Sequence, residues 1–216
     1  MSHITLIRHG QANTGARDEI SYDKLSPLGH QQAEWLGAHL RDCGDFHPRI
    51  YTGTLVRHIE TAASMGHAEA VRDPRLNELE YFTLAELLKE QQGIEIPTER
   101  EGFIQHLPTV FTAWKNGEID GPPESFQAFE TRVSDALHEI AAGRGPALVV
   151  TSGGLIAMAM RRFLDLEVPA LARMALAIMN TSVHRLFPIG DQLSPVLFNA
   201  VPHLEAPDRH YAQTHL

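Results

Sequence analysis

The segment TLIRHGQAN (residues 5–13) decides the fold, because a strand-like run ends there in Arg8, His9 and Gly10. Residues 3–7 have the pattern of a short buried strand. An Arg-His pair behind a strand indicates little on its own, since it is often a surface arginine beside a hydrogen-bonded histidine. Its interpretation depends on the residues that come directly after the other strands.

Two other predicted strands end in comparable segments. Residues 49–52 are followed by a Gly-Thr pair at 53–54. The run PALVVT (146–151) is the clearest buried strand in the chain, and Ser-Gly-Gly follows it at 152–154. In open parallel sheets, ligands bind at the edge where the strands have their carboxyl ends. The three segments therefore predict one shared site at that edge.

Strand-like and helix-like segments alternate along the rest of the chain. Further strands are predicted at 69–72, 183–187 and 196–199, and helical periodicity covers 27–43, 56–65, 83–117 with breaks at Gly93 and Pro97, 126–142 and 153–166. This order predicts an α/β fold, a three-layer sandwich whose mostly parallel central sheet has helices on both faces. We expect a single domain over 1–216 with a helical, lid-like insert at about 83–121.

Composition limits the partners and the compartment. The 216 residues are 43% hydrophobic and carry a formal charge of −9, which argues against general binding to nucleic acid or to an anionic membrane. Cys43 is the one cysteine, so no intrachain disulfide can form. The sequence has no signal peptide pattern, no membrane-length apolar run and no compact metal-ligand spacing. We expect a cytoplasmic protein.

Charged residues near the predicted site suggest an anion-binding role. Arg57 lies one turn into the helix after the second strand, and Glu78 and Glu80 follow the third strand. Arginines and a glycine-rich helix start bind anions such as phosphate. A histidine in such a site can attack phosphorus, and a carboxyl group can give a proton to the leaving oxygen.

Several segments together resemble the histidine phosphatase superfamily, the phosphoglycerate mutase-like group. They are Arg8-His9-Gly10, LSPLGHQQA (25–33), YTGTLVRHIETA (51–62), LNE (76–78), PESFQAFETRV (123–133) and ALVVTSGGLI (147–156). The segments occur in the family's order and span the chain from Ile4 to about Leu186. The resemblance implies the α/β fold already expected.

The resemblance also implies roles for individual residues. His9 is the nucleophile that becomes a phosphohistidine, and Arg8 and Arg57 hold the phosphoryl oxygens. Glu78 is the general acid and then the general base, with Glu80 as the second choice. Because the arginines supply the positive charge, no metal and no cofactor is expected.

Ser152 is a departure from the family pattern, since a second histidine usually stands there. A serine donates one hydrogen bond but cannot be cationic, and losing one such donor costs on the order of a hundredfold to a thousandfold in rate. His58 and His184 are considered as replacements and judged poorly placed. Replacing Ser152 with histidine is expected to raise the rate if the absent imidazole is limiting.

Additional phosphate contacts are predicted from Gln11, Asn13, Ser152 and Gly153. For Gln11 and Asn13, ordinary loop polarity is an equally good explanation. The helix start at Gly153 offers backbone N–H groups to an anion.

Three functions are compatible with the residues. The first is a phosphomonoester hydrolase, a histidine-type phosphatase acting through His9. The second is a catalytically impaired protein that binds a phosphorylated ligand, which the serine at 152 favours. The third, less favoured, is a phosphoglycerate-type mutase. A small phosphorylated molecule is the expected partner in each case, and the insert at 83–121 is expected to set its identity. The oligomeric state is not predicted.

Overall fold

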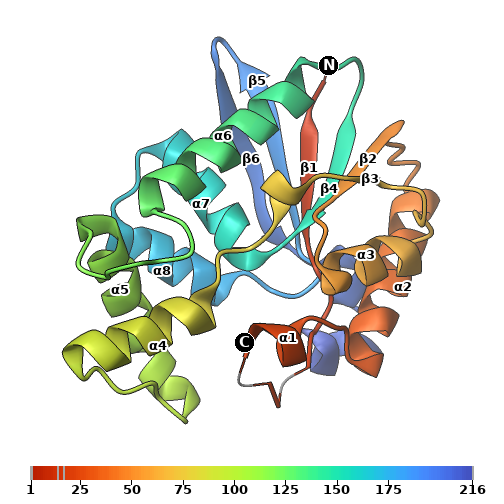
Figure 1. Cartoon of the computed structure of the whole chain (residues 1–216). Coiled ribbons are helices and arrows are strands. Elements are labelled where there is room, and N and C mark those ends of the chain that lie inside the picture. The colour runs from red at the N-terminus through yellow and green to blue at the C-terminus, as the bar shows by residue number, and fades with distance from the viewer. Residues whose placement is uncertain (1, 14, 17, 216) are drawn as a thin grey trace.

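A six-stranded sheet forms the centre of the molecule in the computed structural model, which describes residues 2–13, 15–16 and 18–215 (Figure 1). The strands are β1 (Ile4–Arg8), β2 (Arg49–Thr52), β3 (Val71–Arg72), β4 (Ala147–Thr151), β5 (Val183–Ile189) and β6 (Gln192–Ala200). They lie in the order β3-β2-β4-β1-β5-β6. The first four are parallel, whereas β5 and β6 are antiparallel to their neighbours. The mostly parallel sheet is confirmed.

Alternating side chains divide the core into two layers. Strands β1 and β4 are buried along their whole length. Leu6 and Val149 face one cluster of apolar side chains, and Ile7 and Val150 face the other. Because successive residues of a strand point to opposite faces, each strand contributes to both layers. This explains why the strand sequences are apolar without alternation.

Helices cover both faces of the sheet. They are α1 (Glu19–Tyr22), α2 (Pro27–Asp42), α3 (Val56–Ser64), α4 (Tyr81–Gln92), α5 (Arg100–Asn116), α6 (Phe126–Ala142), α7 (Gly153–Leu164) and α8 (Val168–Ala177), with 3₁₀ turns at Pro74–Leu76, Pro202–Leu204 and Pro207–Ala212. Helices α2 and α3 pack on one face, and α6 and α7 pack on the other (Figure 1). None of the helices in the described part of the chain has the length and apolar character that crossing a bilayer requires.

Helix starts follow the capping residues. Ser26 accepts a hydrogen bond from the Gly29 N–H and begins α2, and Ser125 does the same for Ala128 and begins α6. Two helices differ from the sequence prediction. The short α1 was not predicted, and the segment after α7 forms α8 rather than a connection. Asp165 ends α7 in the left-handed conformation, and Pro169 then stands near the start of the new helix.

The carboxyl ends of the parallel strands meet at the lower end of the view in Figure 1. Arg8 at the end of β1 is paired in register with Thr151 at the end of β4, and Thr52 of β2 pairs with Val150. The chain leaves all three strands at nearly the same level. Helices α4 and α5, within the predicted insert, lie beside this end of the sheet (Figure 1). Whether they act as a lid stays a prediction.

Candidate active site

His9 follows β1 directly and is held in one orientation. Its side chain is 2% exposed, and its backbone N–H donates to the Thr151 carbonyl at 2.8 Å. The ring Nδ1 lies 2.7 Å from the Gly10 carbonyl oxygen. A carbonyl only accepts, so Nδ1 carries the ring proton in this contact, and the neutral ring then has its lone pair on Nε2.

The surroundings of His9 keep its ring neutral. Burial lowers its pKa well below the ordinary value, and the positive charges of Arg57 and Arg8 lower it further. The Gly10 carbonyl acts in the opposite direction with a smaller effect. Low-dielectric surroundings and nearby cations both disfavour a protonated imidazole. The site therefore contains a histidine with a free lone pair at neutral pH.

Arg57 is fixed from outside its own helix. It is 2% exposed, and its Nη1 donates to Asp23 Oδ1 at 3.0 Å. The same carboxylate accepts the backbone N–H groups of Val56 and Arg57, at 3.0 and 3.2 Å. Leu55, the residue before α3, has no side chain that can do this. Asp23 thus caps α3 and positions its arginine at once.

Arg8 lies beside the start of α7. It is 6% exposed, and its Nη1 donates to the Ile178 carbonyl. A Cβ added to Gly153 would stand 3.4 Å from Arg8 Nε. Among the described residues, neither Arg8 Nε nor Arg57 Nε has a hydrogen-bond partner, although both atoms are buried. Two guanidinium groups therefore keep an unused N–H in this region, which is a favourable arrangement for an anion.

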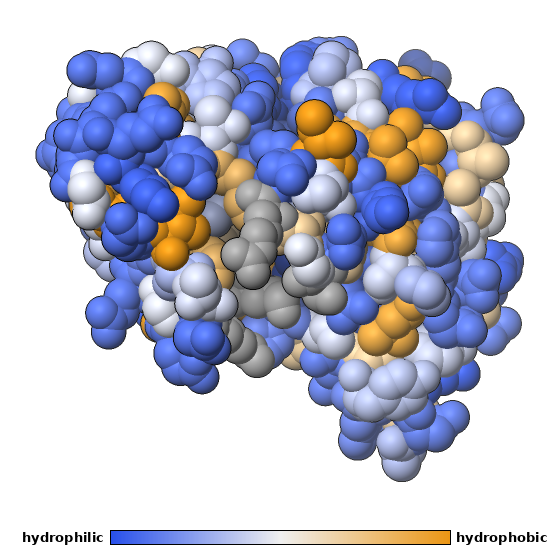
Figure 2. Space-filling model, turned by 60° about the horizontal axis from the view of Figure 1, so that its bottom comes forward, coloured by the Kyte–Doolittle hydropathy of each residue, from blue (hydrophilic) through white to orange (hydrophobic). Residues whose placement is uncertain are grey.

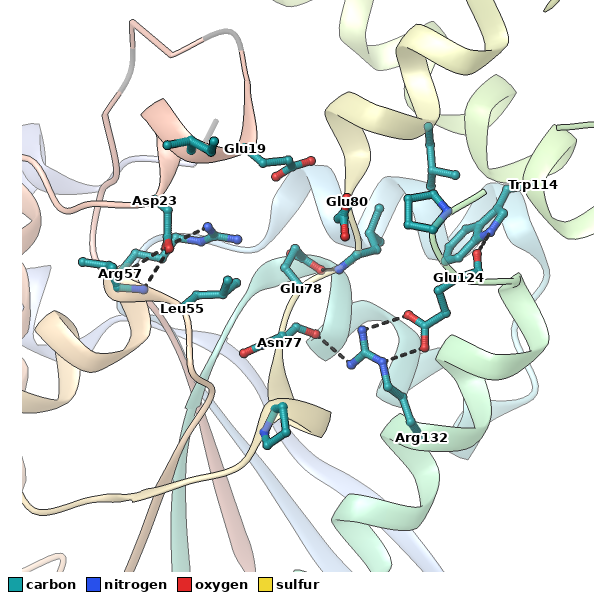
Figure 3. Close-up of a pocket in the computed structure, with 16 residues that line it drawn as sticks. Glu19, Asp23, Leu55, Arg57, Asn77, Glu78, Glu80, Trp114, Glu124 and Arg132 are labelled. Atoms are coloured by element: carbon teal, nitrogen blue, oxygen red, sulfur yellow. Dashed lines mark hydrogen bonds and ion pairs between the residues drawn. The ribbon is translucent and has the colours of Figure 1, made fainter. Parts of the chain in front are cut away.

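Glu78 is attached to the same helix start. Its Oε2 accepts the Gly154 N–H at 2.8 Å, and its Oε1 accepts the Leu79 N–H at 3.0 Å. A Cβ on Gly154 would overlap Glu78 Oε1, so a side chain there would push the carboxyl group out of this position. Arg132 of α6 supports the segment from behind by donating to the Asn77 carbonyl at 2.8 Å (Figure 3). The carboxyl group is therefore held at the strand edge that carries His9.

His58 occupies space beside Ser152. Both side chains are fully buried, and His58 Nε2 lies 2.5 Å from Ser152 Oγ. The His58 ring centroid is 5.8 Å from that of His9. Burial and then Arg57 lower the pKa of His58 well below its usual value. The His58 ring therefore lies beside residue 152, and whether it takes the place of the second histidine stays a prediction.

A cavity of about 770 Å³ opens beside these residues. It is lined by Glu19, Ile20, Asp23, Leu55, Val56, Arg57, Pro74, Asn77, Glu78, Leu79, Glu80, Leu84, Trp114, Pro123, Glu124 and Arg132 (Figure 3). His9 is not part of this lining, and its ring packs edge-on against Tyr22 with centroids 6.1 Å apart. Arg57, which does line the cavity, is close enough to His9 to lower its pKa, so it connects the cavity with the nucleophile candidate.

The remaining predicted site residues have local contacts in the structure. Gln11 Oε1 accepts from the Ser26 hydroxyl at 2.8 Å, and Asn13 Nδ2 donates to the Ser21 carbonyl at 2.9 Å. Glu80 is exposed and accepts from the Thr83 hydroxyl at 3.1 Å. Phosphate binding by Gln11 and Asn13 therefore stays a prediction, as does the second-choice role of Glu80.

Comparison with known proteins assigns the chain to a family. Residues 4–201 match the model of the histidine phosphatase superfamily, branch 1, so the chain belongs to that family. Its members are phosphatase- and mutase-type enzymes that transfer a phosphoryl group through a histidine. No curated protein matches the chain in sequence.

Several solved structures share the fold across nearly the whole chain. A phosphoserine phosphatase mutant from Entamoeba histolytica, in complex with phosphoserine, is 19% identical with a TM-score of 0.70, and the match covers 94% of this chain and 100% of that one. A mycobacterial glucosyl-3-phosphoglycerate phosphatase in complex with VO3 is 24% identical with a TM-score of 0.65, covering 93% and 100%. A phosphoglycerate mutase from Bacillus anthracis is 19% identical with a TM-score of 0.66, covering 94% of each chain. At these identities the likeness establishes the fold.

Three residues of the site were not predicted from the sequence. Asp23 and Glu19 come from the short α1 and its end, a segment with too few residues to show a periodic pattern. His58 contacts a residue 94 positions away in the chain. The sequence signal that could have indicated this contact was a histidine directly after Arg57 in a chain with a serine at position 152.

Proposed function

We propose that the protein is a phosphomonoester hydrolase that works through a phosphohistidine intermediate on His9. The observation that supports it best is the state of the His9 ring, which is neutral, has Nδ1 engaged by Gly10 and has no hydrogen bond at Nε2 from the residues that the structure describes. A protein that only binds a phosphorylated ligand has no need for this arrangement. The positions of Arg8, Arg57 and Glu78 around the same strand edge are consistent with catalysis.

In the first step, the Nε2 lone pair of His9 forms a bond to phosphorus while the ester P–O bond breaks. The departing oxygen takes a proton from the Glu78 carboxyl group. Arg8 and Arg57 donate their unused N–H groups to the phosphoryl oxygens. The positive charge that develops on the His9 ring is stabilised by the Gly10 carbonyl, which accepts a hydrogen bond from Nδ1–H.

In the second step, a water molecule attacks phosphorus and the N–P bond breaks, so the electron pair returns to Nε2. The Glu78 carboxylate takes the proton of that water, which regenerates its acid form. Gly154 and Leu79 N–H groups keep the carboxyl group in place during both steps. Inorganic phosphate is the product.

Ser152 and His58 act in this scheme as a pair. The hydrogen bond between His58 Nε2 and the Ser152 hydroxyl fixes that hydroxyl at the start of α7, whichever of the two groups donates. His58 is then a positioning residue for Ser152. An imidazole from α3 thereby occupies the region that the serine at 152 leaves open.

The test is phosphate release from a panel of phosphomonoesters that includes an activated aryl phosphate, measured with the native chain and with His9→Ala. We expect turnover that falls by roughly a thousandfold or more in the variant, since it removes the nucleophile. Equal rates for the two proteins, or no release from any ester, would contradict the proposal. The second outcome would favour a protein that binds a phosphorylated ligand, the alternative suggested by Ser152.

A further inference from the structure

Carboxylates dominate the charge of the cavity beside His9. Its lining contains Glu19, Asp23, Glu78, Glu80 and Glu124, against the guanidinium groups of Arg57 and Arg132. Each guanidinium is already paired with one of these carboxylates, Arg57 with Asp23 at 3.0 Å and Arg132 with Glu124 at 2.7 Å. Within the described residues, Glu19, Glu78 and Glu80 therefore have no ion-pair partner.

Glu19 of α1 points towards Glu78 and Glu80, which belong to the segment that leads into α4 (Figure 3). Both oxygens of Glu78 accept backbone N–H groups. Glu19 uses Oε1 to accept the Phe82 N–H at 2.9 Å, and Glu80 uses Oε2 to accept the Thr83 hydroxyl. One oxygen of Glu19 and one of Glu80 thus remain for a ligand.

Burial is the main reason that the pKa of Glu19 is raised to about 7. The Phe82 N–H and Arg57 act to lower the pKa, and the charges of Glu78 and Glu80 raise it by a smaller amount. A cation placed near Glu19 would favour its ionised form, whereas an anion would disfavour it.

Arg57 provides an independent sign of a ligand in the same cavity. It lines the cavity and is only 2% exposed, yet its Nε has no partner in the described part of the chain. That N–H favours an anion, while the free oxygens of Glu19 and Glu80 favour a cation. A ligand that satisfies both ends carries the two charges on one molecule.

We propose that the cavity selects phosphomonoesters whose organic part carries an ammonium group, with Glu19 and Glu80 binding that group. This inference rests on the proposed function of His9. The phosphoryl group faces Arg8 and Arg57, and the ammonium group faces the two free carboxylate oxygens. An ester with a carboxylate in the same place meets like charge and is disfavoured. On this end of the molecule, hydrophilic residues alternate with smaller hydrophobic patches (Figure 2).

The test compares three esters of similar size that differ in charge. They are O-phosphoethanolamine with an ammonium group, propyl phosphate with none, and phosphoglycolate with a carboxylate. We expect kcat/KM to fall in that order, by at least about tenfold from first to last. A kcat/KM for propyl phosphate or phosphoglycolate that is equal to or higher than the value for O-phosphoethanolamine would overturn the inference.

Substitutions of the carboxylates that line the cavity test whether Glu19 and Glu80 cause the preference for the amine ester. Glu19→Gln and Glu80→Gln should each reduce the preference for the amine ester over propyl phosphate by about two- to fivefold, as expected for a partly exposed ion pair. Glu205→Gln, which changes an exposed carboxylate after the Pro202–Leu204 turn, is the matched control and should leave the preference unchanged. A preference that is the same in all three variants would contradict the assignment.

Binding to His9→Ala separates this inference from the proposed function. Calorimetric titration of the variant with the three esters should give the same order of affinity without any turnover. If the native chain releases phosphate from no ester, the hydrolase proposal fails, but the order of affinities still decides the charge preference. Absence of amine-ester binding at millimolar concentration, or tighter binding of phosphoglycolate, would overturn the preference.

Discussion

At the scale of single residues, the contact between His58 and Ser152 changes what a substitution at 152 should do. From the sequence alone, Ser152→His is expected to raise the rate if the absent imidazole is limiting, and to leave it unchanged or lower it if the site has been rebuilt around serine. In the structure both side chains are fully buried with 2.5 Å between His58 Nε2 and Ser152 Oγ, and a Cβ on Gly53 would overlap the other side of the His58 ring. A second imidazole has no room there.

We therefore expect Ser152→His alone to destabilise the protein by about 1–3 kcal/mol, the cost of overpacking a buried site, and to lower the rate. The double variant His58→Ala with Ser152→His removes the overlap and should recover both stability and turnover relative to the single variant. Thermal unfolding and kcat measured on the three proteins check this. A single variant that is as stable as the native chain and faster would show that the two positions are independent.

The strand ends made part of the site predictable from the sequence. Arg8 and His9 stand at the end of a recognisable strand, and Glu78 was chosen through the family resemblance; their shared edge of the sheet then follows from the parallel strands. The contact of His58 with Ser152 was not predicted, because the two residues are distant in the chain and one sequence carries no information on such a pair. Catalytic roles for these residues remain predictions.

At the scale of elements, Asp23 connects α1 with the start of α3. Asp23→Ala removes both the cap of α3 and the ion pair with Arg57, so we expect a loss of about 1 kcal/mol in unfolding free energy and a higher KM. Asp23→Asn is the matched variant: Val56 N–H and Arg57 N–H donate to different oxygens of Asp23, so the one amide oxygen of Asn still accepts one of them. Urea unfolding and steady-state kinetics should show Asn keeping part of the stability but not the KM. Equal effects of the two substitutions on stability and on KM would show that the ion pair with Arg57, and not the cap, is what matters.

Long elements were predictable and short ones were not. The helix at Phe126–Ala142 has the predicted bounds, since a serine cap and a regular apolar stripe define it. Helix α1 has four residues and is stabilised by the Asp18 cap and by tertiary contacts such as Glu19 with Phe82. Helix α8 is apolar on most sides, so periodicity did not separate it from a connection.

At the scale of the whole molecule, buried neutral histidines should make the protein sensitive to acid. Burial lowers the pKa of His184 and of His203 to about 3, and the pKa values of His9 and His58 are also well below normal. The unfolded chain binds these protons near pH 6.5, so the folded state binds fewer protons between about pH 6.5 and pH 3.

The unfolding free energy should therefore be highest above pH 6.5 and fall as the pH drops, by up to about 1.4 kcal/mol per pH unit for each such histidine. Glu19, whose pKa is raised, acts in the opposite direction as a single group. Urea unfolding between pH 5 and pH 8 measures the slope, and His203→Gln should reduce it. A flat profile over this range would contradict the neutral state of the buried histidines.

The central claim is that His9 carries the phosphoryl group during turnover, and trapping that intermediate tests it most directly. The native chain is mixed with an activated aryl phosphate, quenched in alkali, where phosphohistidine persists, and digested for mass spectrometry. The account predicts a phosphoryl adduct on the peptide that contains His9, absent from His9→Ala. Phosphate release without an adduct at His9, or an adduct on another residue, would contradict it.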